Sequence, residues 1–277
     1  MNEPRAASPL PPALACCDLS AGYGSRVVFE GVSLDICAGQ WTAVVGPNGS
    51  GKSTLLRTLA GLRQPRGGAI SLQGKPLLAW PRRERARRLA WLAQNSGATD
   101  LTATEVVALG RFAHGGWLAH RQAADAAAMH RAMAATGSLS WARRRLSTLS
   151  GGERQRVHLA RVLAAEAPVM LLDEPTTHLD PPHQEEVAQL LREQAHRGVC
   201  VVSAIHDLSL ALAADRLIVL GRYGVIGHGT VRDALSGDWL SAAFQTHVQI
   251  VEQQGVLLWR PALGAGAPVI ANGSEPP

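Results

Sequence analysis

A glycine-rich run early in the chain has the spacing of a phosphate-binding loop. It reads Gly46-Pro47-Asn48-Gly49-Ser50-Gly51-Lys52-Ser53-Thr54 and fits the pattern Gly-x-x-x-x-Gly-Lys-Ser. In such a loop the backbone N–H groups close around phosphates, and the helix expected to begin near Ser53 directs the positive end of its dipole at them. Lys52 would place its charge on the β- and γ-phosphates, and the Ser53 hydroxyl would face Mg²⁺. The run therefore predicts a nucleoside triphosphate site.

Two adjacent acids, Asp173 and Glu174, follow an apolar run that reads Val169-Met170-Leu171-Leu172. Successive side chains of a strand point to opposite faces, so the two acids cannot do the same work. One of them would hold Mg²⁺, usually through water, and the other would activate the attacking water. Acids also end strands at the surface without any catalytic role, but the phosphate-binding loop favours the catalytic interpretation.

A third run, Leu149-Ser150-Gly151-Gly152-Glu153, predicts the start of a helix. Backbone amides at such a start face outward and can bind phosphate. Ser150, with Glu153 three residues later, also fits a capping box. The two interpretations are compatible, because a capped helix start remains an anion site.

These three runs, ending in Leu171-Leu172-Asp173-Glu174-Pro175, resemble in order and spacing the P-loop, signature and Walker B motifs of the ATP-binding cassette (ABC) ATPases. The resemblance covers about residues 14 to 231. It implies an α/β fold, with a P-loop NTPase core that carries an N-terminal antiparallel β subdomain and a helical subdomain. It also implies that the protein is an ATPase with Mg²⁺ as cofactor.

The resemblance assigns catalytic roles to single positions. Glu174 matches the family's general base, and Asp173 and Ser53 match its metal ligands. Gln94 matches the Q-loop glutamine, which touches the metal or the water and lies at the hinge to the helical subdomain; Ala93 replaces a common proline there. His206 matches the switch histidine that contacts the γ-phosphate.

Other family positions concern the nucleotide and a second copy of the chain. Tyr23 matches the aromatic residue that stacks on adenine, and the alternative to this role is a half-buried strand tyrosine. Asp180 matches the D-loop, with Thr177 and His178 where small residues are frequent. In the family each ATP is closed between the P-loop of one copy and the signature of another, so the resemblance implies a homodimer.

Finer marks resemble the branch that serves uptake of ferric siderophores, haem and cobalamin. They are the run from Val106 to His114 and His183-Gln184 after the D-loop. The resemblance implies a subunit that energises an importer from the cytoplasmic face of the bacterial inner membrane. Its partners would be integral membrane permease subunits and, indirectly, a periplasmic or lipoprotein substrate-binding protein. The alternatives are the ATPase of an exporter and a soluble ABC ATPase of nucleic acid or ribosomes, which usually has two cassettes or a long coiled-coil insert.

A mostly parallel sheet with crossover helices must position these residues. The expected strands are Trp41–Val45, Trp91–Ala93, Val169–Leu172, Val199–Ala204 and Leu217–Leu220. Glycines between Leu14 and Ile70 predict short antiparallel strands. Alanine-rich sequence between Asp100 and Arg145, clearest over Gln122–Ala135, predicts a helical insert.

The expected division of the chain is a tail at 1–13, an ABC ATPase domain at 14–250 with a helical subdomain at about 95–154, and an extension at 251–277. Residues 263–277 are poor in charge and rich in small residues, which predicts disorder.

Composition limits the remaining functions. A chain of 277 residues with 46% hydrophobic and 18% charged residues is not disordered in bulk, and no apolar run approaches the ~20 residues of a membrane span.

The start has no apolar segment of a secretion signal, so the four cysteines are expected to be reduced and buried. The arginines of residues 82–88 are interpreted as a solvated helix face, and no nucleic-acid partner is expected. A metal site at His178, Asp180 and His183 is disfavoured because no fourth ligand is apparent.

Overall fold

A computed structural model describes residues 12–94, 97, 99–115, 123–246, 248–253 and 256–261. Residues 1–11 of the predicted N-terminal tail lie outside these ranges. The segment predicted to be disordered, residues 263–277, also lies outside them. The extension predicted at 251–277 is described only as far as residue 261.

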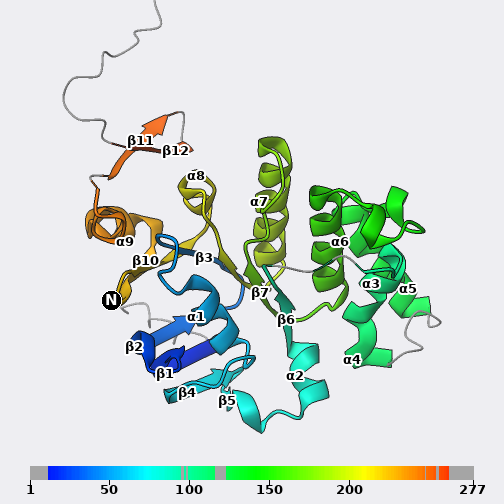
Figure 1. Cartoon of the computed structure of the whole chain (residues 1–277), viewed down its shortest axis with the longest axis horizontal. Helices are drawn as coiled ribbons and strands as arrows, with labels where there is room; N and C mark the ends of the chain where they lie inside the picture. Colours follow the sequence, from blue (N-terminus) through cyan, green and yellow to red (C-terminus); the bar gives the residue numbers. More distant parts are fainter. Residues whose placement is uncertain are drawn as a thin grey trace, which may run out of the picture.

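A six-stranded sheet forms the centre of the molecule (Figure 1). Its strands are β3 (Trp41–Val45), β6 (Leu89–Leu92), β7 (Val169–Asp173), β8 (Cys200–Ala204), β9 (Arg216–Gly221) and β10 (Gly224–Thr230), in the order β10-β9-β3-β8-β7-β6. Neighbours are parallel from β9 to β6, and β10 is antiparallel to β9. The five predicted strands and the mostly parallel sheet are confirmed, with bounds that differ by at most two residues.

The sheet is buried on both faces. Trp41, Ala43 and Val45 of β3 pack into one apolar core, and Val44 points into the core on the opposite face. Helices α1 (Lys52–Leu59), α7 (Pro181–His196), α8 (Leu208–Ala211), α9 (Val231–Ser236) and α10 (Trp239–Phe244) contribute to these cores. This alternation within one strand gives each face its own layer of helices.

A second sheet, antiparallel as predicted, covers α1. Its strands are β1 (Leu14–Tyr23), β2 (Arg26–Ile36), β4 (Gly67–Leu72) and β5 (Lys75–Pro76), in the order β2-β1-β4-β5. The prediction that its strands are short is wrong for β1 and β2, which have 10 and 11 residues. The pairing of β1 with β2 contains register shifts and continues past Asp18 and Gly31, which both have positive φ.

The alternation of β1 also corrects the prediction for the cysteines. Cys16 and Cys200 are buried, and burial raises the pKa of their thiols to about 11 and about 12, respectively. Cys17 is exposed because it follows Cys16 on the strand and so points to the opposite face.

The described residues between β6 and β7 form helices and short 3₁₀ turns joined by loops, in agreement with the predicted helical character. They are α3 (Ala103–Ala108), η2 (Leu109–Arg111), α4 (Phe112–Gly115), α5 (Ala123–Ala135), η4 (Leu139–Trp141), η5 (Leu146–Thr148) and α6 (Gly151–Ala164). Gln122, the expected start of α5, lies outside the described residues. α3, α5 and α6 share an apolar core of their own.

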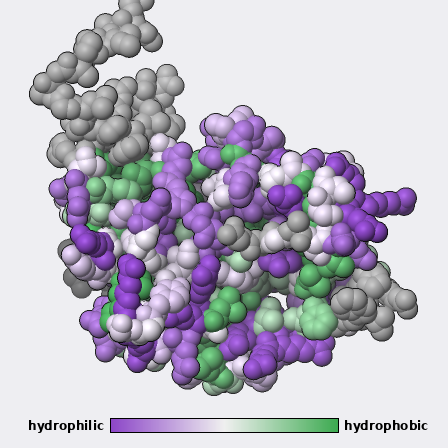
Figure 2. Space-filling model, viewed as in Figure 1, coloured by the Kyte–Doolittle hydropathy of each residue, from purple (hydrophilic) through white to green (hydrophobic). Residues whose placement is uncertain are grey.

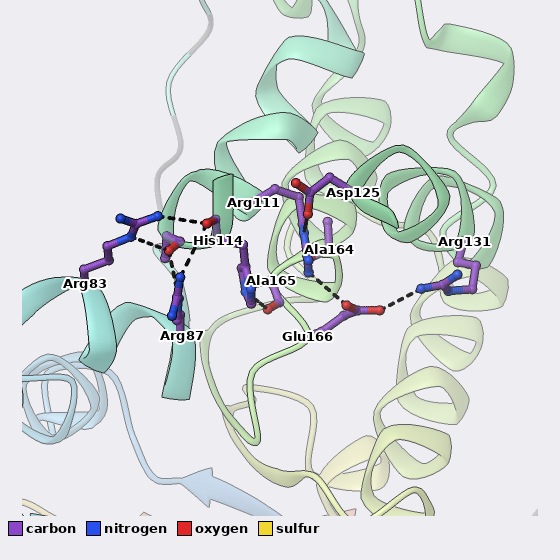
Figure 3. Close-up of polar contacts among 10 residues, drawn as sticks. Arg83, Arg87, Arg111, His114, Asp125, Arg131, Ala164, Ala165 and Glu166 are labelled. Atoms are coloured by element: carbon purple, nitrogen blue, oxygen red, sulfur yellow. Dashed lines mark hydrogen bonds and ion pairs between the residues drawn. The ribbon is translucent and has the colours of Figure 1, made fainter. Parts of the chain in front are cut away.

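The arginine run forms α2 (Arg82–Arg88), of which no residue is buried. Its interpretation as a purely solvated face needs a correction. Arg83 Nε and Arg87 Nε donate to the Ala113 carbonyl oxygen at 2.8 and 2.9 Å, and Arg83 Nη2 donates to that of His114 at 2.8 Å (Figure 3). The carbonyls at the end of a helix have no partner within it, so these guanidinium groups satisfy the end of α4.

A buried arginine of η2, Arg111, connects this region to α5 and to the end of α6. Arg111 donates to Asp125 Oδ1 at 2.6 Å, to the Ala164 carbonyl oxygen at 2.9 Å and to Glu166 Oε2 at 2.9 Å (Figure 3). Glu166 Oε1 in turn accepts from Arg131 at 2.8 Å. We call Arg83, Arg87, Arg111, Asp125 and Glu166 the junction.

The surface view is mainly hydrophilic with separate hydrophobic patches (Figure 2). Among the described residues, no helix combines the length and the apolar character needed to cross a bilayer.

Candidate functional site

The glycine loop follows β3 and leads into α1, as its sequence predicts. Gly46, Gly49 and Gly51 have φ values of 151°, 78° and 102°, a region that favours glycine. A Cβ on Gly46 would lie 2.2 Å from the Leu220 carbonyl oxygen, and one on Gly51 would lie 2.4 Å from Val28 Cγ1. The loop can therefore form only because these positions lack side chains.

Lys52 is the first residue of α1, and its ammonium turns back onto the loop. Nζ donates to the carbonyl oxygens of Gly46 at 2.7 Å and Pro47 at 3.1 Å. Burial lowers the pKa of Lys52, and Glu174 and Asp173 oppose this effect in part. A buried cation whose only hydrogen bonds in the described structure go to neutral carbonyls is prepared to meet an anion.

Asp173 ends β7 beside the start of α1. Its Oδ1 accepts from Ser53 Oγ at 2.8 Å, whereas its buried Oδ2 has no hydrogen bond from the described residues. Arg57 Nη2 lies 3.8 Å from Oδ2, too far for a hydrogen bond. Burial raises the pKa of the Asp173 carboxyl, and the Ser53 hydrogen bond opposes that rise. A hydroxyl beside a carboxylate with an unused oxygen is an oxygen donor set that fits Mg²⁺.

Glu174 is the best-held side chain of the site. Its Oε1 accepts from Gln94 Nε2 at 2.8 Å and contacts His206 Nε2 at 2.5 Å, and its Oε2 accepts from Thr177 Oγ1 at 3.0 Å. Burial alone raises the pKa of Glu174, but these hydrogen bonds, first that of His206, bring it below the ordinary value. The carboxylate is thus ionised at neutral pH and can accept a proton.

The backbone at Glu174 adopts φ 55°, which is unusual for a residue with a side chain. Gln155 Nε2 donates to the carbonyl oxygens of Glu174 at 3.1 Å and Pro175 at 3.0 Å and so holds this turn. Gln155 and Thr177 were not predicted as site residues. The available signal was their position: Gln155 lies two residues after Glu153, the end of the signature run, and Thr177 lies three residues after Glu174.

A cavity of about 810 Å³ lies between the glycine loop, Lys52 and Glu174. It is lined by Tyr23, Arg26, Val28, Asn48, Gly49, Gly51, Lys52, Ser53, Thr54, Gln94, Glu174 and His206. The structure therefore gathers the proposed base, the switch histidine, the Q-loop glutamine and most of the P-loop around one space. The sequence analysis did not select Arg26 or Val28, which enter the cavity from the strand that pairs with the Tyr23 strand.

The predicted signature residues lie elsewhere. Ser150 caps α6 in the predicted capping box: its Oγ accepts from Glu153 N at 3.2 Å, and Glu153 Oε2 accepts from Ser150 N at 2.7 Å. A Cβ on Gly151 or Gly152 would come within 3.2 Å of His178, so the two loops are in close contact. None of Ser150, Gly151 and Gly152 lines the cavity.

Asp180 likewise lies outside the cavity, at the start of α7, where its carboxylate contacts His183 Nδ1. Within the described ranges, no group of three or more His, Cys, Asp or Glu side chains is arranged to hold a metal ion.

Residues 29–177 match the ABC transporter family. The chain is 39% identical over 259 residues to the ferric enterobactin transport ATP-binding protein FepC of Escherichia coli, covering 92% of this chain and 95% of that protein. It is 45% identical over 240 residues to the hemin import ATP-binding protein HmuV of Gloeobacter violaceus, covering 81% and 86%. Its fold is similar to that of the dimeric ATP-binding cassette MJ0796 in a post-hydrolysis state bound to ADP and Pi. The TM-score is 0.70 at 26% identity, covering 79% of this chain and 99% of that one.

Proposed function

Because the chain belongs to the ABC transporter family, we propose that it hydrolyses ATP to energise the import of an iron chelate, either a ferric siderophore or haem. Cobalamin is the third cargo of the branch that the sequence resembles. The observation that carries the proposal is the single cavity in which a glycine loop, a buried lysine and an ionised glutamate meet. The names of the relatives support the transport step and the class of cargo.

The P-loop would hold the triphosphate. Its backbone N–H groups surround the phosphates, and the start of α1 favours their negative charge. Lys52 already lies at the loop, so a phosphate oxygen can take a hydrogen bond from Nζ with little rearrangement.

Ser53 and Asp173, with Gln94 close to Glu174, would hold Mg²⁺. Bound there, Mg²⁺ would neutralise phosphate charge that grows during the transfer. The unused Oδ2 of Asp173 is the observation that supports this assignment.

Glu174 would act as the general base. Water attacks the γ-phosphorus and loses a proton to a Glu174 carboxylate oxygen while the bond to the bridging oxygen of ADP breaks. His206 and Gln94 both contact Oε1, so they orient the carboxylate from two sides. The proton then leaves Glu174 for phosphate or solvent.

A second copy of the chain would complete the site. The signature residues 150–152 and Asp180 do not line the cavity of their own chain, so a head-to-tail pair would place them on the γ-phosphate of the other copy. The dimeric cassette MJ0796 supports this arrangement.

A permease would bind at a groove beside the junction. This groove of about 620 Å³ is lined by residues of α2, β6, η2, the start of α4 and the end of α6, including Arg82, Trp91, Leu109 and Phe112. The two apolar side chains Leu109 and Phe112 are exposed there. A permease at this groove would hold the subunit at the cytoplasmic face of the inner membrane and, through its own binding protein, receive the cargo.

Growth on defined iron sources tests the proposal. A strain that lacks this chain should fail to grow on haem or on one ferric siderophore as the sole iron source. The wild-type chain should restore growth, and Glu174→Gln should not. Normal growth of the deletion strain on every iron source, combined with sub-micromolar RNA binding at physiological salt, would instead favour the nucleic-acid alternative.

A further inference from the structure

An arginine covers one face of the tyrosine that is proposed to stack on adenine. The Arg63 guanidinium lies 3.6 Å from the centroid of the Tyr23 ring, within the range of a cation–π contact. Arg63 Nε is buried and has no hydrogen bond from the described residues. Stacking on the ring is therefore the main compensation for removing this part of the guanidinium from water.

The end of α1 delivers Arg63 to this place. Gly61, at φ 67°, ends the helix, and the backbone N–H groups of Leu62 and Arg63 both donate to the Arg57 carbonyl oxygen, at 2.9 and 3.1 Å. This closed turn fixes where the Arg63 side chain begins. The position of the guanidinium is thus built into the helix end.

Tyr23 is held at a second point by the same helix. Its hydroxyl lies 3.4 Å from Thr54 Oγ1, in the first turn of α1, next to Lys52 and Ser53. α1 therefore holds the phosphate-binding residues at its start and supports the aromatic ring through both its first turn and its end. The distance between the base platform and the phosphate site is set by one rigid element.

Tyr23 borders the nucleotide cavity, and Arg63 does not. Tyr23 lines the cavity together with Arg26 and Val28, whereas Arg63 is not among the lining residues. Tyr23 as a residue is 46% exposed, so the Arg63 contact leaves part of it accessible to a ligand. A base that stacks on the ring face opposite the guanidinium would leave the contact with Arg63 in place.

We propose that Arg63 is a positioning residue for the nucleotide base: it fixes the Tyr23 ring from behind, so that guanidinium, phenol and purine form one stack. This inference rests on the proposed role of Tyr23. Because the Tyr23 ring is already fixed before ATP binds, binding does not have to pay the entropy of ordering that side chain. We expect about a two- to tenfold contribution to ATP affinity, the lower part of the range for cation–π contacts.

The test compares ATP with inorganic tripolyphosphate, a probe that has the phosphates but no base. Equilibrium titrations use the full chain with Arg63→Met, Arg63→Lys, Tyr23→Ala and the Arg63→Met/Tyr23→Ala double variant. Arg63→Met should weaken ATP binding about two- to tenfold and leave tripolyphosphate binding unchanged. The Arg63 effect should disappear in the Tyr23→Ala background, and Arg63→Lys should retain part of the affinity.

The chain provides a matched control. Arg222 lies over the Tyr223 ring at 5.7 Å, and Tyr223 is 85% exposed and outside the cavity. Arg222→Met removes the same charge beside the same type of ring and should leave the affinity for both ligands unchanged.

Three results would overturn the inference. ATP affinity could stay unchanged in Arg63→Met, it could increase because the guanidinium competes with the base, or both ligands could weaken equally. If Arg63→Met does not fold, Arg63→Lys decides, since wild-type affinity for ATP in that variant together with weakened ATP binding in Tyr23→Ala would contradict the stack. Failure of the proposed function differs from these results, because then Tyr23→Ala itself would not weaken ATP binding.

Discussion

Two equally buried cations, Lys52 in the cavity and Arg111 in the junction, are held in opposite ways. Each residue is 6% exposed. Arg111 meets two carboxylates and one carbonyl oxygen, and its neighbours Arg83 and Arg87 also have carbonyl partners (Figure 3). Lys52 donates to two backbone carbonyl oxygens, and no carboxylate of the described residues lies within hydrogen-bond distance of it. A buried cation with its anions in place stabilises the fold, whereas one without an anion marks a place for a ligand.

The two acids near Lys52 also have features that are costly to the folded state. Asp173 Oδ2 has no hydrogen bond from the described residues, and Glu174 has a backbone at positive φ. Unsatisfied polar atoms and unusual backbone conformations are costly and persist mainly at functional sites. The junction is not free of this cost, since Asp125 Oδ2 also has no hydrogen bond from the described chain. Substitutions should therefore affect function in the cavity and stability in the junction.

The largest expected effect is on catalysis. Glu174→Gln keeps the shape of the side chain but cannot accept a proton, so the rate of ATP hydrolysis should fall by roughly a hundred- to ten-thousandfold. The free energy of unfolding should change by less than about 1 kcal/mol, because the amide can keep part of the contacts. Steady-state phosphate release and chemical denaturation measure the two quantities. A rate within threefold of the wild type would remove Glu174 from the mechanism.

The same substitution at the two cations tests the comparison most evenly. Arg111→Met leaves Asp125 buried without its partner and should cost about 3–5 kcal/mol of unfolding free energy, with little change in ATP affinity of the folded protein. Lys52→Met should weaken ATP binding about ten- to a hundredfold, as expected for loss of a hydrogen bond from a charged group, and should leave stability within about 1 kcal/mol.

Denaturation curves and ATP titrations of Arg111→Met and Lys52→Met give the unfolding free energy and the ATP affinity of each variant. Adding Asp125→Leu to Arg111→Met should recover most of the lost stability, since the unpaired charge is removed. If both variants lost stability and nucleotide affinity alike, the two cations would not differ in role.

A smaller effect of opposite sign is expected at Asp173. Burial raises the pKa of this carboxyl, which means that the ionised form weakens the folded state at neutral pH. Asp173→Asn should therefore stabilise the nucleotide-free protein by about 0.5–2 kcal/mol while Mg²⁺-dependent hydrolysis is lost. Thermal unfolding with and without Mg²⁺ and ATP checks both statements. A destabilised variant would show that Asp173 is part of the structural framework.

The smallest effect is expected at the surface of the junction. The Arg87 side chain is 36% exposed and shares the Ala113 carbonyl oxygen with Arg83. Arg87→Met should cost less than about 1 kcal/mol, because the remaining arginine and water can satisfy the carbonyl. A loss as large as that of Arg111→Met would mean that the exposed contacts, not the buried ones, hold the helical region.

Sequence predicted the parts of this molecule that depend on local spacing. The P-loop, the capping box at Ser150 and the five parallel strands each follow from neighbouring residues, because turn conformation and strand alternation are local properties. The predicted roles of the cavity residues remain proposals, although the structure brings most of those residues together.

Contacts between distant segments could not be read in this way. Gln155 and Thr177 contact Glu174 only because α6 and the loop after β7 pack together. Arg63, which follows α1, contacts Tyr23 at the end of β1. The arginine run has a helical pattern that fits a solvated face. Arg83 and Arg87 donate hydrogen bonds to the Ala113 carbonyl oxygen only because α4 packs beside them. The long β1 and β2 strands depend on register shifts that glycine spacing alone does not reveal.

The central claim, an ATP site completed by a second copy, is tested most directly by the mass of the Glu174→Gln protein in solution. Size-exclusion chromatography with light scattering should give one chain, 29.3 kDa, without ATP and about twice that mass with ATP and Mg²⁺. Adding Ser150→Arg should keep the protein at one chain by filling the place of the γ-phosphate. A Glu174→Gln protein that binds ATP and still remains at 29.3 kDa at high concentration would contradict the composite site.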